Sequence, residues 1–124
     1  MSPETHPDLV EVCPVQGVTV VRFTRRTILD PAAIEALGER LLALAREEAG
    51  RRLVLDFARV ESLTSAMLGK FAVVQATVAE AGGRVVCCNV GDFLRQIFTV
   101  CGFPDAIPIH ADEAAAVQAL TATP

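Results

Sequence analysis

The most informative part of the chain is the stretch Leu53-Val54-Leu55-Asp56-Phe57-Ala58-Arg59-Val60-Glu61-Ser62-Leu63-Thr64-Ser65-Ala66-Met67-Leu68-Gly69. A short apolar run that contains an acid near its end predicts a buried strand over Leu53–Phe57. The hydroxyl residues Thr64 and Ser65 then predict the start of a helix. A serine there lies near unpaired backbone N–H groups and the positive end of the helix dipole. A phosphate would be tolerated locally, yet it would add a charge of about −1.5 to −2 among apolar residues, which is the physical basis of a phosphorylation switch.

Patterns of strand and helix alternate on both sides of this stretch. Two β-rich runs flank Gln16-Gly17 and predict a hairpin, in which Pro14 favours an edge position or a bulge. Asp30-Pro31 predicts an N-cap and a helix that ends at Gly50. The predicted strands are Leu9–Val15, Val18–Phe23, Leu53–Phe57, Arg84–Asn89 and Ala106–Ile109, the last confined to an edge by Pro108, and the predicted helices begin at Asp30-Pro31, Thr64, Asp92 and Asp112.

This order predicts one α/β domain over residues 9–121. We expect a mixed, mostly parallel sheet of about five strands with four helices, in the order β-β-α-β-α-β-α-β-α. Residues 1–8 are polar and contain proline, so we expect a flexible N-terminal tail and not a signal peptide. The apolar runs are shorter than the roughly 18 residues that a membrane span needs, and we expect no direct membrane insertion.

Composition argues against several kinds of site. The 124 residues carry a formal net charge of −4, and the basic residues are scattered without interleaved aromatic residues, so nucleic-acid binding is not expected. The four cysteines, Cys13, Cys87, Cys88 and Cys101, lack the spacing of a zinc site. They predict inert, buried thiols in a reducing cytoplasm, with Cys87 and Cys88 on opposite faces of a strand and no metal bound.

The central stretch resembles the signature of STAS domains, the family of anti-sigma-factor antagonists. That signature is a strand ending in Leu-Asp-Leu, a short loop, and Asp-Ser-Ser-Gly-Leu-Gly at the start of a helix. The corresponding residues here are Leu55-Asp56-Phe57 and Thr64-Ser65-Ala66-Met67-Leu68-Gly69. Gly82-Gly83 before a strand, and the helix Phe93–Phe98 followed by Gly102-Phe103, also match the family. The STAS fold has the element order predicted above, and the resemblance spans nearly the whole chain.

The resemblance implies a role for several residues. Ser65 matches the phosphorylated serine, and Thr64, which stands in place of the family's aspartate, is a second candidate phosphoacceptor. Asp56 is expected to accept hydrogen bonds from loop amides and so to position Ser65, while Asp30 caps the first helix close to the serine. Lys70 is expected to be a solvated side chain. The predicted partner-binding residues are Thr64, Ala66, Met67 and Leu68, with Met67 exposed beside Ser65.

The implied function is a partner-switching circuit without a cofactor or a catalytic residue. The unphosphorylated domain would bind an anti-sigma factor that is also a serine kinase, and phosphorylation of Ser65 would weaken that binding until a serine phosphatase reversed it. The family leaves two alternatives open, a scaffold of a multi-protein signalling complex and a STAS subunit of a lipid transporter. A response-regulator receiver would need an acidic cluster after the first strand and a lysine near the last, which the sequence lacks. A small enzyme would need a phosphate loop, a nucleophile elbow or a metal-ligand cluster, and none occurs.

Overall fold

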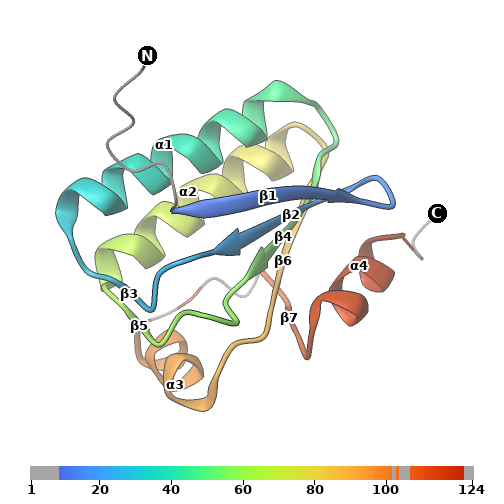
Figure 1. Ribbon diagram of the computed structural model, residues 1–124. Coiled ribbons are helices and arrows are strands. Elements are labelled where there is room, and N and C mark those ends of the chain that lie inside the picture. Colours follow the sequence, from blue (N-terminus) through green and yellow to red (C-terminus); the bar gives the residue numbers. More distant parts are fainter. Residues whose placement is uncertain (1–8, 102, 104–106, 122–124) are drawn as a thin grey trace.

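The computed structural model describes residues 9–101, 103 and 107–121, so the tail predicted for residues 1–8 lies outside the described residues. Figure 1 shows strands and helices alternating through this part of the chain. The strands are β1 (Val10–Val15), β2 (Val18–Phe23), β3 (Thr27–Ile28), β4 (Arg52–Asp56), β5 (Ser62–Leu63), β6 (Arg84–Cys88) and β7 (Ile109–His110). The helices are α1 (Pro31–Glu47), α2 (Ser65–Glu80), α3 (Asp92–Cys101) and α4 (Glu113–Thr121).

The main sheet has five strands in the order β1-β2-β4-β6-β7. β1 is antiparallel to β2, and all the other neighbours are parallel. The hairpin turns at Gln16 and Gly17, whose φ angles of 53° and 81° are those of the two-residue turn that suits the twist of the strands. Pro14 lies in the edge strand β1, as predicted. The mixed sheet with four helices is therefore confirmed.

The two faces of the sheet carry separate hydrophobic cores. Because successive side chains of a strand point to opposite faces, Leu53 and Leu55 of β4 join the core beneath α1 and α2, whereas Val54 faces α4. The second core is thinner and consists of small and medium-sized side chains: Val18, Val20, Val54, Val86, Cys88, Ala116, Val117 and Leu120. Both faces of the central strands are covered, which explains the almost uninterrupted apolar runs in their sequences.

An aromatic cluster fixes the end of β4. The ring of Phe57 lies 5.0 Å from that of Phe23, 5.5 Å from that of Phe71 and 5.6 Å from that of Phe98, measured between centroids. Such offset and edge-to-face pairs stabilise beyond the area that they bury. The residue directly after Asp56 is thus anchored in the main core.

The structure departs from the predicted elements at three places. A second, two-stranded parallel sheet pairs β3 with β5, and neither strand was predicted. The last strand is Ile109–His110 and not Ala106–Ile109, because Pro108 has no N–H to donate and pairing of β7 begins after it; residues 104–106 lie outside the described residues. α1 ends at Glu47, three positions before Gly50.

The adjacent cysteines Cys87 and Cys88 are both buried, one in each core, as the alternation of a strand requires. Burial raises the pKa of the Cys87 thiol to about 12. Burial also raises the pKa of Cys88, and the nearby Asp56 carboxyl group adds to the shift. Since the thiolate is the reactive form, both thiols should be inert in the folded protein.

We therefore expect Cys87 and Cys88 to react slowly with a maleimide at pH 7.5 and the partly exposed Cys13 to react sooner. Peptide mapping by mass spectrometry after timed quenching measures the rate at each residue. Unfolding in guanidinium should bring all four cysteines of the chain to complete labelling, which is the control. Rapid modification of Cys87 or Cys88 in the native protein would contradict their burial.

Candidate functional site

The short sheet of β3 and β5 brings the starts of α1 and α2 together (Figure 1). Ile28 pairs with Leu63 in parallel register, and Asp30 and Ser65 each follow two residues later. The two helices therefore begin side by side, with their first turns at the same end of the molecule. Asp30 and Ser65 thus occupy equivalent positions at the starts of two neighbouring helices.

Each of the two helices has a capped start. Asp30 Oδ2 accepts a hydrogen bond from the Ala33 amide at 3.0 Å. Thr64 Oγ1 accepts one from the Met67 amide at 3.4 Å. These are the contacts by which short polar side chains satisfy the first N–H groups of a helix. Thr64 is thus occupied as a cap, whereas Ser65 is the first residue of α2 and is exposed.

Asp56 organises the loop between β4 and β5. Among the described residues it is the one charged side chain that is buried, with 4% of its surface exposed. Its Oδ1 accepts hydrogen bonds from the Ala58 amide at 2.8 Å and from Asn89 Nδ2 at 3.1 Å. The predicted contact with a loop amide is confirmed. Burial raises the pKa of Asp56, and the nearby Glu113 carboxyl group raises it further.

The prediction that Met67 is exposed beside Ser65 is wrong. Met67 has 0% and Leu68 4% of its surface exposed, so neither side chain is available to a partner. Met67 begins the buried stripe of α2 that continues through Phe71, Val74 and Val78. The same helical spacing is present in the sequence, and it identifies Met67 as a core residue.

Apart from Asp30 at the start of α1, the exposed residues of α2 near Ser65 and the exposed Leu29 carry no charge. Leu29, which the sequence did not single out, follows β3 directly and is 50% exposed. The exposed side of α2 continues from Ser65 in residues without charge. We call this group the switch surface; its members are Leu29, Ser65, Ala66, Gly69 and Val73.

Lys70 is not the solvated side chain that was expected. Its ammonium group lies 2.8 Å from the Glu35 carboxylate of α1, which neutralises the one charge on this part of α2. Its aliphatic stem crosses α1 at Gly38, where a Cβ atom would come within 2.9 Å of Lys70 Cδ. A larger residue at Gly38 would therefore require the Lys70 side chain to shift.

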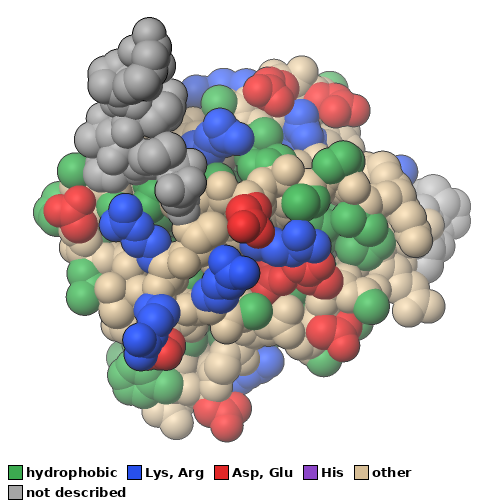
Figure 2. All heavy atoms as spheres, in the orientation of Figure 1, with side chains coloured by type: hydrophobic (Ala, Val, Ile, Leu, Met, Phe, Trp, Pro, Cys, Tyr) green, Lys and Arg blue, Asp and Glu red, His purple; other side chains and the backbone are tan. Residues whose placement is uncertain are grey.

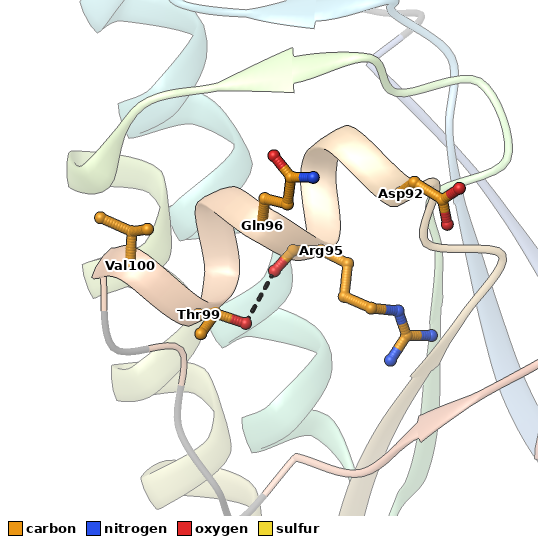
Figure 3. Close-up of a pocket in the computed structure, with 5 residues that line it drawn as sticks. All are labelled: Asp92, Arg95, Gln96, Thr99 and Val100. Atoms are coloured by element: carbon orange, nitrogen blue, oxygen red, sulfur yellow. Dashed lines mark hydrogen bonds between the residues drawn. The ribbon is translucent and has the colours of Figure 1, made fainter.

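The helix α3 lies against β5, next to the switch surface (Figure 1). Phe93 and Val100 at its two ends are 62% and 85% exposed. A shallow hollow on its outer side is lined by Asp92, Arg95, Gln96, Thr99 and Val100. Figure 3 shows these side chains spread outward from one helix, with the Thr99 hydroxyl turned back to the Arg95 carbonyl at 3.0 Å. This shape suits a protein partner better than an enclosed small molecule.

Other kinds of site receive no support from the described residues. They contain no group of three or more His, Cys, Asp or Glu side chains arranged to hold a metal ion. None of the helices described has the length and apolar composition to cross a bilayer. On the face shown in Figure 2, acidic and basic side chains lie next to one another, so that this face has no continuous basic area.

Comparison with known proteins places this chain in a family. The family model of the Mlab STAS domain matches residues 21–109. A protein of Bordetella bronchiseptica named "Putative anti-sigma factor antagonist BtrV" is 32% identical over 98 residues, which are 78% of this chain and 84% of the relative.

Solved structures share the fold. A STAS domain protein from Planctomyces limnophilus superposes with a TM-score of 0.81 at 18% identity, over 90% of this chain and 96% of that one. The anti-sigma factor antagonist SpoIIAA in its unphosphorylated form gives 0.76 at 17% identity, over 93% and 98%. Together with the matched family model and the Bordetella relative, this shows that the chain belongs to the STAS-domain family of anti-sigma-factor antagonists.

Proposed function

We propose that this chain acts in a partner-switching circuit by binding an anti-sigma factor that is also a serine kinase. The observation that supports this most strongly is the position of Ser65, exposed at the first residue of α2 within the uncharged switch surface. The names of the Bordetella relative and of SpoIIAA point to the same class of partner. The domain is then a binding protein whose affinity is regulated, and it needs no cofactor.

The switch surface has the composition of an interface core. Such cores are depleted in charge and contain apolar side chains that a partner can cover. Leu29 and Val73 supply the larger apolar groups, while Ala66 and Gly69 allow a partner to approach the α2 backbone closely. Phe93 of α3 is exposed next to this region and would extend the contact.

Ser65 is a better phosphoacceptor than Thr64. The Thr64 hydroxyl accepts the Met67 amide, and its side chain is only partly exposed. A phosphate on Thr64 would have to rearrange the cap of α2, whereas a phosphate on Ser65 would lie at the solvent-facing start of the helix. The positive end of the helix dipole stabilises such a group without any change in the fold.

Phosphorylation would weaken the complex through charge. The phosphate would be desolvated in an interface whose nearest side chains are apolar, and the Asp30 carboxylate at the start of α1 would add repulsion. Lys70 offers no ready counter-charge because Glu35 already pairs with it. A serine phosphatase would restore binding. These steps take place in the bacterial cytoplasm.

The match to the Mlab STAS model is also compatible with a second function, that of a STAS subunit of a lipid transporter. The adjacent genes discriminate between partner switching and lipid transport. An adjacent anti-sigma kinase or serine phosphatase supports switching, and adjacent permease and ATPase genes support transport.

We expect a serine kinase encoded by an adjacent gene to phosphorylate Ser65 when ATP is supplied. Tandem mass spectrometry of the reacted protein locates the phosphate, and Ser65→Ala should abolish at least about nine-tenths of the incorporation, since Thr64 is occupied as a cap. Incorporation at Thr64 alone, or at neither residue, would contradict the assignment.

Substitutions at Ser65 test the switch directly. Ser65→Ala should keep partner binding, whereas Ser65→Glu should weaken it by roughly 1–3 kcal/mol, about 5- to 150-fold, because a carboxylate is desolvated without a partner. Isothermal titration against the anti-sigma factor gives both affinities. Gln118→Glu, which adds the same charge on the exposed side of α4, is the control and should bind like wild type. A melting temperature of Ser65→Glu far below that of wild type would show a structural role instead.

Asp56→Ala should leave the domain folded but disturb the loop that leads to Ser65. The Ala58 amide and the Asn89 side chain both lose their acceptor, at a cost of roughly 1–3 kcal/mol in the free energy of unfolding. Chemical denaturation measures this loss, and the phosphorylation rate of Ser65 measures the effect on the loop. If neither changes, Asp56 does not organise the loop.

A further inference from the structure

In the part of the chain that the structure describes, α4 covers its face of the sheet without a second helix beside it (Figure 1). It buries three side chains, those of Ala116, Val117 and Leu120, whereas α2 buries five, which include Met67 and Phe71. Because hydrophobic stabilisation grows with the apolar area removed from water, α4 gains less from packing than α2 does. A helix of nine residues is also too short to be stable by itself in water.

A groove of about 680 Å³ runs between α4 and the hairpin of β1 and β2. Its lining includes Val15 and Gln16 from the hairpin and Val117 and Gln118 from α4. A groove of this size means that α4 is not tightly packed along this side. The attachment of α4 therefore depends on the thin second core beneath it and on contacts at its two ends.

Two arginines of the sheet hold the ends of α4. At the first turn, Glu113 Oε2 accepts a hydrogen bond from Arg22 Nε at 2.6 Å, and its Oε1 accepts one from Arg22 Nη2 at 2.9 Å. This two-pronged geometry is the strong form of a carboxylate–guanidinium pair. The two side chains are only 38% and 26% exposed, so solvent screens the pair less than it would screen a fully exposed one. At the last turn, Arg52 Nη1 donates to the Leu120 carbonyl at 3.2 Å.

We propose that α4 is a strap that opens as a unit while the rest of the domain stays folded, and that the ion pair of Arg22 with Glu113 keeps it closed. Segments with few buried apolar contacts are those that open at the lowest free energy. Opening would uncover the second core, in which Val54 and Cys88 lie beneath α4, and would leave the first core intact. The helix that carries Ser65 packs on the other face, so this motion does not depend on the proposed switching function.

The adjacent cysteines of β6 report on the two faces separately. Cys88 lies in the core beneath α4, whereas Cys87 lies in the core beneath α1 and α2. Opening of α4 alone would expose Cys88, and unfolding of the whole domain would expose both. In the wild-type protein we therefore expect a maleimide to label Cys88 more slowly than the partly exposed Cys13 but faster than Cys87. The amides of α4 should also exchange with deuterium faster than those of α2.

Variants of the ion pair test what keeps the strap closed. Arg22→Met and Glu113→Gln each remove the paired charges, and each should raise both the exchange rates of the α4 amides and the labelling rate of Cys88 roughly 5- to 10-fold. Hydrogen exchange and timed labelling, both read by mass spectrometry, measure the two effects. Cys87 and the α2 amides should be unchanged. The double variant should resemble the single variants, because each of these already lacks the pair.

Glu61→Gln is the matched control. Arg26 holds Glu61 in a similar two-pronged but exposed contact at 3.1 and 3.2 Å, and loss of this contact should change neither α4 nor Cys88. Equal labelling rates of Cys87 and Cys88 in the wild type would show that the domain opens only as a whole, and this result would overturn the strap even if a variant failed to fold. Effects that multiply in the double variant would show that Arg22 and Glu113 act separately, and would overturn the role of the pair. No partner is needed, so failure of the proposed function would leave these outcomes unaffected.

Discussion

The burial of one carboxyl group, that of Asp56, constrains much of the rest of the structure. β4 lies in the centre of the sheet with a parallel neighbour on each side and helices over both faces, so the acid at its end is largely shielded from water. A buried acid needs partners on all sides. The partners here are the Ala58 amide and the Asn89 side chain, which both donate to its Oδ1. They come from the loop after β4 and the loop after β6, and one side chain thereby ties these two loops to the same point.

As a consequence, the segment that leads from β4 to the exposed Ser65 is rigid. Phe57 is locked in the aromatic cluster, and the loop ends in the short parallel pairing of β5 with β3. Thr64 then caps α2, so Ser65 begins the helix with little freedom of its backbone. A rigid site of this kind binds a partner at a lower entropic cost than a flexible loop would. Residues at loop sites are often either exposed or well ordered. Ser65 is both, because the β3–β5 pairing and the Thr64 cap fix the start of α2.

Much of the fold was predictable because it depends on local patterns. Asp30-Pro31 and Asp112 begin helices, Gln16-Gly17 makes the hairpin turn, and Asp56 binds an amide two residues away. β3 and β5 were not predictable, because strands of two residues have no measurable periodicity and are recognised only when they pair. The ion pair of Arg22 with Glu113 joins residues far apart in the chain, and the crossing of Lys70 over Gly38 joins two helices; neither has a sequence signal. The error at Met67 differs in kind. The helical stripe identified it as a core residue, and the expectation of exposure came from the family resemblance.

The prolines at the two edges of the main sheet have a further consequence, for behaviour at high concentration. Pro14 lies in β1, and Pro108 comes directly before β7, which is only two residues long. An exposed strand edge invites the addition of another strand and, with it, growth into fibres; proline and brevity both oppose this. The domain can therefore leave an apolar surface open at the start of α2 without also offering a template for sheet extension.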